Sequence, residues 1–156
     1  MPLLSTPPEL IKIANAIAKS EGRSILVGGA VRDHCMGRKS LKDFDVEIFG
    51  ISPEVLESVL RNFGNIHAVG KSFGVLKLKT SSAEYDFSLP RRENRTGKGH
   101  RGFMVTPDST MSYREAASRR DFTVNSIGYD LLTKTLLDPF DGLGDIKHKI
   151  LRHVGP

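Results

Sequence analysis

The chain has 156 residues, 38% hydrophobic and 26% charged, which suits one domain with its own core and excludes a disordered tail. No apolar run approaches the roughly 20 residues of a membrane-spanning helix, and a single cysteine, Cys35, excludes a disulfide scaffold. Lys and Arg number 23 against 18 Asp and Glu, and the resulting +5 favours anionic partners. The N-terminus lacks signal-peptide features, so we expect a cytoplasmic location and no membrane partner.

The first half of the chain predicts alternating helices and strands. Thr6-Pro7-Pro8-Glu9 is typical of a capping box with proline at the first helical position, and an apolar face follows at Leu10, Ile13, Ala14 and Ile17 before Gly22 ends the helix. We expect strands over 24–27 and 45–49, and helices over 30–36 and from Ser52-Pro53-Glu54 to Gly64.

The second half predicts strands over 75–78 and 85–89, a helical stretch over 112–127 in one or two pieces, and a hairpin over 129–138. A short helix over 144–149 and a last strand over 150–154 complete the chain. Several connections are short enough for hairpins, so we expect an α+β fold with a mixed, mostly antiparallel sheet flanked by helices.

Positive charge concentrates in one segment, where five cations accompany a single acid, Glu93: Arg91, Arg92, Arg95, Lys98 and Arg101. Interspersed glycines indicate a mobile basic loop. It is either a solvated surface loop or a loop that faces the phosphates of a nucleotide or nucleic acid, with His100 as a further phosphate contact.

A glycine pair, Gly28-Gly29, stands at a strand-to-helix junction and is followed by Arg32. Paired glycines let the backbone approach a ligand, and Arg32 has the reach to bind a phosphate. The alternative is a tight turn with Arg32 paired to Asp33 at the surface. The spacing does not match a dinucleotide-binding fingerprint.

Three carboxylates occupy two predicted strands. Asp43 and Asp45 are two residues apart, so their side chains are expected to lie side by side, and Asp86 belongs to a neighbouring strand. Adjacent carboxylates suit Mg²⁺ or Mn²⁺, and a third carboxylate nearby is typical of two-metal phosphoryl transfer. By itself a D-x-D motif is a weak indication of a metal site, and it also occurs in metal-dependent glycosyltransferases.

The segment Arg119-Arg120-Asp121 precedes Asn125. If the segment is helical, Asp121 and Asn125 share one face, where Asp121 can accept from a ribose hydroxyl while Arg120 holds phosphate. The alternative is a salt-bridged surface helix. Cys35 and the five histidines show no zinc-site spacing, and the Asp138–Gly144 stretch is typical of a turn that orients the last helix.

Together these motifs resemble the head domain of the class II tRNA nucleotidyltransferase and bacterial poly(A) polymerase family, in the polymerase-β-like nucleotidyltransferase superfamily. The matching segments run in order through most of the chain: LVGGAVRD (26–33), KDFDVE (42–47), YDFSLPRRE (85–93), GKGHRGF (97–103), RRDFTVNSI (119–127) and LLDPFDGLGDIKHKILRHV (136–154).

The resemblance implies a nucleotidyltransferase that joins CMP or AMP from CTP or ATP to a tRNA 3′ end with release of pyrophosphate. It implies two Mg²⁺ ions on Asp43 and Asp45, with Asp86 as the third carboxylate. It also implies nucleotide contacts from Gly28, Gly29, Arg32 and Arg120, and ribose contacts from Asp121 and Asn125.

The chain departs from the family in one respect. Residues 1–156 cover the head, and the neck, body and tail that follow it in the family, including the base-selecting residues, are missing. We therefore expect a truncated piece. Base choice and oligomeric state are not predicted from this sequence. A poly(A) polymerase head and a non-catalytic RNA-binding module are the alternative functions.

Overall fold

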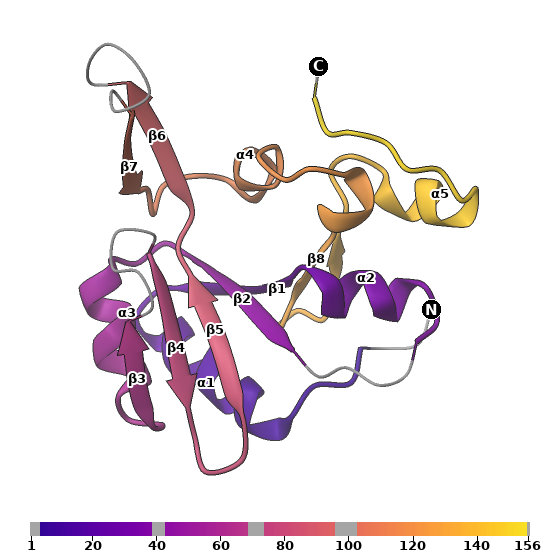
Figure 1. Ribbon diagram of the computed structural model, residues 1–156. Coiled ribbons are helices and arrows are strands. Elements are labelled where there is room, and N and C mark those ends of the chain that lie inside the picture. The colour runs from indigo at the N-terminus through magenta and orange to yellow at the C-terminus, as the bar shows by residue number, and fades with distance from the viewer. Residues whose placement is uncertain (1–3, 39–42, 69–73, 96–102, 156) are drawn as a thin grey trace.

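The computed structural model describes residues 4–38, 43–68, 74–95 and 103–155. A seven-stranded sheet forms its centre, in the order β3-β4-β5-β2-β1-β8-β9 (Figure 1). The strands are β1 (Arg23–Val27), β2 (Phe44–Phe49), β3 (Asn65–Ala68), β4 (Val75–Lys79), β5 (Glu84–Ser88), β8 (Gly128–Asp130) and β9 (Leu136–Leu137). Strands β2 and β5 run parallel and the other neighbours antiparallel, which confirms the predicted mixed sheet.

Helices cover both faces of this sheet. They are α1 (Pro8–Lys19), α2 (Gly29–Cys35), α3 (Pro53–Leu60), α4 (Tyr113–Ala117), α5 (Gly142–Lys147) and the 3₁₀ helix η3 (Thr123–Asn125). The larger core lies under α1 and α3, and a smaller one lies on the opposite face under α4. None of the helices in the described ranges is long and apolar enough to cross a membrane.

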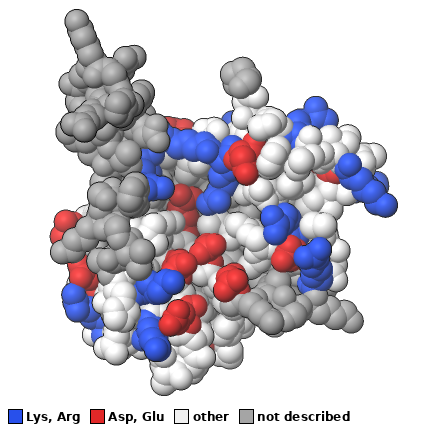
Figure 2. Space-filling view, viewed as in Figure 1, with Lys and Arg blue, Asp and Glu red and all other residues white. Residues whose placement is uncertain are grey.

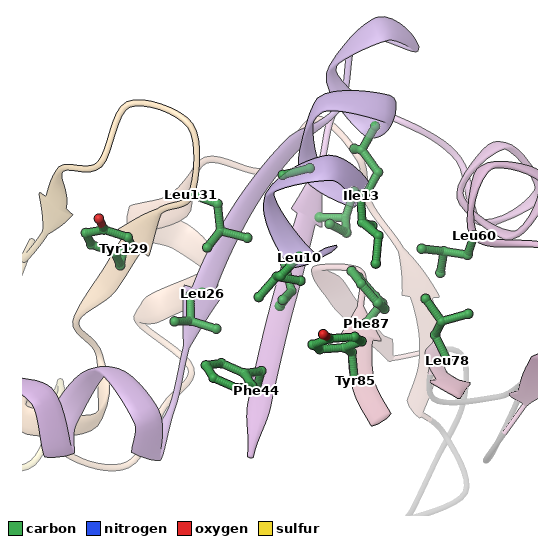
Figure 3. Close-up of a cluster of buried hydrophobic side chains, with 14 of the residues drawn as sticks. Leu10, Ile13, Leu26, Phe44, Leu60, Leu78, Tyr85, Phe87, Tyr129 and Leu131 are labelled. Carbon is green, nitrogen blue, oxygen red and sulfur yellow. The ribbon is translucent and has the colours of Figure 1, made fainter. Parts of the chain in front are cut away.

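Strand β2 shows how the sequence divides the two faces. Val46 and Ile48 are fully buried in the core under α1, whereas Phe49 packs under α4 against the ring of Tyr113. Phe44 also points into the larger core, among the aromatic and aliphatic side chains drawn in Figure 3. The alternation leaves Asp45 and Glu47 on the face opposite the larger core.

The predicted capping box at the start of α1 is wrong. The N-cap is Pro7, and no side-chain cap bond forms there among the described residues, although Pro8 does occupy the first turn. Glu9 turns instead toward the sheet, where it accepts hydrogen bonds from the Thr80 hydroxyl (2.9 Å) and the Tyr85 hydroxyl (3.0 Å). A tertiary contact has therefore replaced the local one.

The basic segment is not a loop over its first five residues. Arg91–Arg95 forms β6, which pairs antiparallel with β7 (Phe103–Pro107) in a separate two-stranded sheet. The ladder satisfies backbone groups that a loop would leave to water. Lys98, His100 and Arg101 lie outside the described residues.

Other differences concern short elements. β3 was not predicted, because a polar–apolar alternation of only four residues is too short to indicate a strand. The helical stretch over 112–127 forms only α4 and η3, because Phe122 between them is extended, with φ −121° and ψ 152°. The last predicted strand is reduced to a bridge between His153 and Phe122.

Candidate active site

The centre of the site is a pair of carboxylates on the two parallel strands. Asp45 of β2 and Asp86 of β5 are register partners, so their side chains leave the same face of the sheet. Asp43 directly precedes β2 and is exposed. The expectation of a third carboxylate on a neighbouring strand is thereby confirmed. Acidic side chains gather over β2 and β5 in Figure 2 and are bordered by Lys and Arg.

The electrostatics of this pair disfavour two negative charges. Burial raises the pKa of Asp45, the charges of Asp86 and Asp43 and a hydrogen bond with Asp86 raise it further, and Arg120 opposes the shift. Like charges this close stay ionised together only when a cation lies between them. The donor set therefore fits a hard divalent cation.

A cation of the protein already touches one member of the pair. Lys77, the β4 register partner of Asp86, places its Nζ 3.7 Å from an Asp86 carboxylate oxygen. Within the described ranges, no three Asp, Glu, His or Cys residues converge into a closed metal cage. Mg²⁺ commonly takes only one or two carboxylates and completes its shell with water and substrate phosphates, so an open pair suits it better than a cage.

Gly28 lies directly beside the carboxylate pair, because the preceding residue, Val27, is the register partner of Asp45. Its backbone has φ 78° and ψ −149°, a conformation essentially restricted to glycine. A Cβ added there would lie 3.4 Å from Oδ2 of Asp45. Gly28 thus keeps the space beside the Asp45 carboxylate free of a side chain.

Arg32 of α2 joins the glycine turn to a distant segment. Its Nε donates to Oδ1 of Asp33 at 3.3 Å, so the surface pairing of Arg32 with Asp33, one of the two predicted alternatives, does form. Its Nη1 also donates to the side-chain oxygen of Asn125, 93 residues away, at 3.0 Å. The structure therefore brings two of the predicted nucleotide-binding residues into contact.

Asp121 and Asn125 do meet, although no continuous helix joins them. The Asn125 amide donates to Asp121 at 3.1 Å, and that carboxylate also accepts from the backbone N–H of Phe122 at 2.7 Å. These hydrogen bonds, with Asn125 as the largest cause, lower the pKa of Asp121. Arg32, Asn125 and Asp121 consequently form one hydrogen-bonded chain.

Arg120 lies on the carboxylate side of the site, where it acts electrostatically on Asp45 and on Glu47. Glu47 is 8% exposed, and its Oε1 has no hydrogen-bond partner in the described part of the chain. Burial raises its pKa, against the charges of Arg120 and Arg91. Glu47 had no predicted role, although its i, i+2 spacing from Asp45 was an available signal.

A pocket of about 550 Å³ adjoins the Arg32–Asn125 contact. Polar and charged groups line one part of it (Arg32, Asp33, Arg38, Asn125, Asp145 and Lys149) and apolar groups another (Met36, Phe122, Val124, Ile146, Ile150 and Leu151). Asp145 had no predicted role either, because nothing local in the sequence distinguishes it from a surface acid on a short helix.

Cys35 and Asp138 have structural roles. Cys35 packs against the larger core, and burial, followed by the charge of Asp138, raises its pKa, so it is not an activated thiol. Asp138 accepts from the backbone N–H groups of Gly142 (2.7 Å) and Leu143 (3.0 Å), which confirms that the turn orients the last helix.

Three comparisons with known proteins agree with this geometry. The family model described as the poly A polymerase head domain matches residues 24–152. A multifunctional CCA protein of Xylella fastidiosa (strain 9a5c) is 40% identical over 134 residues, 86% of this chain and 30% of that protein. One of Stenotrophomonas maltophilia (strain K279a) is 41% identical over 131 residues, 84% of this chain and 30% of that protein. The chain thus spans about a third of the length of these relatives.

Solved structures are similar over nearly the whole chain. The CCA-adding enzyme of Bacillus stearothermophilus, in complex with CTP, gives a TM-score of 0.75 at 28% identity, over 97% of this chain and 34% of that one. A tRNA nucleotidyltransferase complexed with a primer tRNA and an incoming ATP analogue gives 0.70 at 28% identity, over 92% of this chain and 39% of that one.

Proposed function

The chain belongs to the poly(A) polymerase head-domain family, and from this premise we propose that residues 1–156 are the catalytic head of a tRNA nucleotidyltransferase. It transfers CMP or AMP from CTP or ATP to the 3′ hydroxyl of a tRNA in the cytoplasm. The hydroxyl oxygen bonds to the α-phosphorus, the bond from that phosphorus to the β-phosphate oxygen breaks, and pyrophosphate leaves. The relatives named for CCA and the neighbours bound to CTP or tRNA support this substrate class.

The observation that carries the proposal is the register pairing of Asp45 with Asp86, next to Asp43. Asp43 and Asp45 are the residues that would hold divalent cations, Mg²⁺ or Mn²⁺, with Asp86 beside them. When bound, two such ions neutralise phosphate charge and lower the pKa of the attacking hydroxyl. The raised pKa of Asp45 is consistent with this assignment, because burial and the charges of Asp86 and Asp43 disfavour its ionised form, which a divalent cation would favour.

The other site residues orient the nucleotide. Gly28 and Gly29 leave room for the triphosphate beside Asp45, and the guanidinium groups of Arg32 and Arg120 bind its oxygens. Asp121 and Asn125 hold the ribose hydroxyls. The contacts of Asn125 with both Asp121 and Arg32 support a single site that extends from the phosphates to the sugar.

The matching family model also favours a second candidate, a poly(A) polymerase head that uses ATP alone. The two functions share this chemistry and differ in the product. Incubation of the complete gene product with tRNA lacking its 3′ CCA, with CTP and ATP, separates them by gel. Addition that stops after one to three nucleotides supports the tRNA enzyme, and a long A tail supports the polymerase.

The chemistry is tested with the isosteric variants Asp45→Asn and Asp86→Asn. Titration calorimetry with ATP and CTP, in Mg²⁺ and in EDTA, is expected to show metal-dependent binding that each variant weakens at least about ten-fold, and Asp45→Asn should abolish transfer. Glu57→Gln is the matched control, because Glu57 of α3 forms an ion pair with the exposed Arg61 that follows this helix. Full transfer by Asp45→Asn would overturn the proposal. RNA binding that persists in EDTA and ignores nucleotides would support a non-catalytic RNA-binding module.

A further inference from the structure

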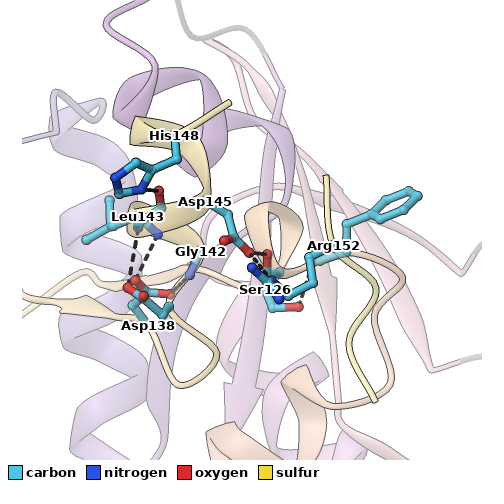
Figure 4. Close-up of polar contacts among 11 residues, drawn as sticks. Ser126, Asp138, Gly142, Leu143, Asp145, His148 and Arg152 are labelled. Carbon is cyan, nitrogen blue, oxygen red and sulfur yellow. Dashed lines mark hydrogen bonds and ion pairs between the residues drawn. The ribbon is translucent and has the colours of Figure 1, made fainter. Parts of the chain in front are cut away.

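A buried acid of α5 holds the turn that carries Asn125. The Thr123 hydroxyl donates to Oδ2 of Asp145 at 2.6 Å, and Nε of Arg152 donates to the same oxygen at 3.2 Å. Thr123 is 2% and Asp145 7% exposed. Figure 4 shows Asp145 reaching from α5 toward this turn, with Arg152 on the other side.

The turn has little room to move away from α5. A Cβ at Gly142 would clash with the backbone oxygen of Thr123, so the backbone of α5 lies directly against the turn. The start of α5 is itself fixed by the Asp138 carboxylate, which accepts from Gly142 and Leu143. Asp145 therefore acts from a helix whose own position is set independently.

The same turn determines where Asn125 points. Thr123 and Asn125 are the first and last residues of the three-residue helix η3. The Asn125 side chain accepts from Arg32 at 3.0 Å and donates to Asp121 at 3.1 Å. A shift of about 1 Å at Thr123 would move Asn125 out of hydrogen-bonding range of at least one of these partners.

We propose that Asp145 is a positioning residue for the nucleotide ribose: through Thr123 it fixes the turn that presents Asn125 between Arg32 and Asp121. This inference rests on the proposed function, in which Asp121 and Asn125 hold the ribose. Asp145 itself touches no substrate. It acts by pre-organisation, because a side chain held in its bound geometry loses less entropy when the ligand arrives.

Another buried acid supplies a matched control for a purely structural role. Asp130 is 4% exposed and accepts from Nε of Arg23 at 2.8 Å, an environment close to that of Asp145. It belongs to β8, and its strand partner Ile25 lies two residues before Val27, the residue beside the glycine pair. Asp130→Asn is therefore expected to lower stability as Asp145→Asn does, without moving Asn125.

The first measurement is the ratio of the dATP to the ATP dissociation constant in Mg²⁺. Asp145→Asn and the isosteric Thr123→Val should each lower this ratio by roughly ten-fold, and the double variant should fall no further than either alone. Asp130→Asn should leave the ratio unchanged at a comparable loss of stability. If Asp145→Asn does not fold, Thr123→Val tests the same contact by itself.

The second measurement needs no ligand. Amide hydrogen exchange at Asn125 and Ser126, whose N–H groups bond to Phe122 and Thr123, should accelerate at least about ten-fold in Asp145→Asn and Thr123→Val, and not in Asp130→Asn. Unchanged exchange and an unchanged nucleotide ratio in both variants would overturn the positioning role. If Asn125→Ala leaves the ratio intact, the ribose assignment of the proposed function fails, while the exchange result still decides what Asp145 holds.

Discussion

Asp45 and Asp86 are register partners on two adjacent parallel strands, and burial together with the charge of Asp86 raises the pKa of Asp45. The carboxyl group of Asp45 therefore costs the fold stability, because burial and the neighbouring negative charges disfavour its ionised form. An arrangement that costs stability and is held by central strands is typical of a functional site.

Removing one of these charges should therefore stabilise the metal-free protein. In EDTA we expect Asp45→Asn to raise the free energy of unfolding by about 1 kcal/mol, because burial and the charges of Asp86 and Asp43 disfavour the ionised form of Asp45. With Mg²⁺ and ATP the order should reverse, since the wild type gains binding energy that the variant has lost. Urea denaturation in both buffers measures this. A variant less stable than the wild type in EDTA would show that the pair supports the fold.

Gly28→Ala should damage both backbone and site. A φ of 78° with ψ −149° costs a non-glycine residue about 1–3 kcal/mol, and the new methyl group would lie 3.4 Å from Asp45. Gly37→Ala is the matched control, because Gly37 also has a positive φ, 84°, but open space around it. Both variants should lose stability in thermal denaturation. Only Gly28→Ala should weaken Mg²⁺-dependent ATP binding, and equal ATP affinities in the two would contradict the role of Gly28.

Glu9→Gln tests the contact that replaced the capping box. Glu9 accepts two hydroxyl hydrogen bonds from the sheet, so we expect a loss of about 1–2 kcal/mol in the free energy of unfolding. Glu54→Gln is the control, since Glu54 follows a proline in the first turn of α3 in the same way but is exposed, and it should change stability by less than about 0.5 kcal/mol. Thr80→Val should lower the free energy of unfolding as Glu9→Gln does. If Thr6→Ala lowers it and these two variants do not, the capping box forms after all.

The stability of the protein should depend on pH through Asp130. Burial alone would raise its pKa, but hydrogen bonds from Arg23, Thr133 and Leu132 and the charge of Arg23 outweigh burial and lower it below the ordinary 3.8. A lowered folded-state pKa means that the carboxylate stabilises the fold above its unfolded-state pKa, and that this contribution is lost as the pH falls through the folded-state pKa.

The difference in unfolding free energy between the wild type and Asp130→Asn should therefore be constant, at about 1–3 kcal/mol, near neutral pH. It should shrink below about pH 4. Urea denaturation across this range measures it. A difference that grows toward acid would show that the pKa of Asp130 is raised instead.

The sequence predicted those parts of the molecule whose signals are local. Apolar spacing located the buried face of α1, and the strand predicted over 45–49 matches β2 within one residue. Where long-range contacts compete with local ones, prediction failed. Glu9 bonds to the β4–β5 hairpin instead of its own helix terminus, and the arginines of β6 are in a strand because β7 pairs with them.

The site divides in the same way. The convergence of Asp45 and Asp86 was predictable from two strand patterns and their expected adjacency. The contact of Arg32 with Asn125 spans 93 residues, and the bond from Thr123 to Asp145 depends on how α5 packs. No local pattern encodes either contact, so Asp145 could not be distinguished from an ordinary surface acid.

The position of β1 within the sheet has a consequence for how the chain is made. β1 pairs with β2, its sequence neighbour among the strands, and with β8, and Arg23 meets Asp130 across 107 residues. On the ribosome, one edge of this central strand therefore waits unpaired until β8, whose Asp130 follows Arg23 by 107 residues, has emerged. Unpaired edges attract other strands, and non-local pairing is slow. The central sheet is thus completed only once β8 has been made, and until then the exposed edge of β1 is a site where the nascent chain can aggregate.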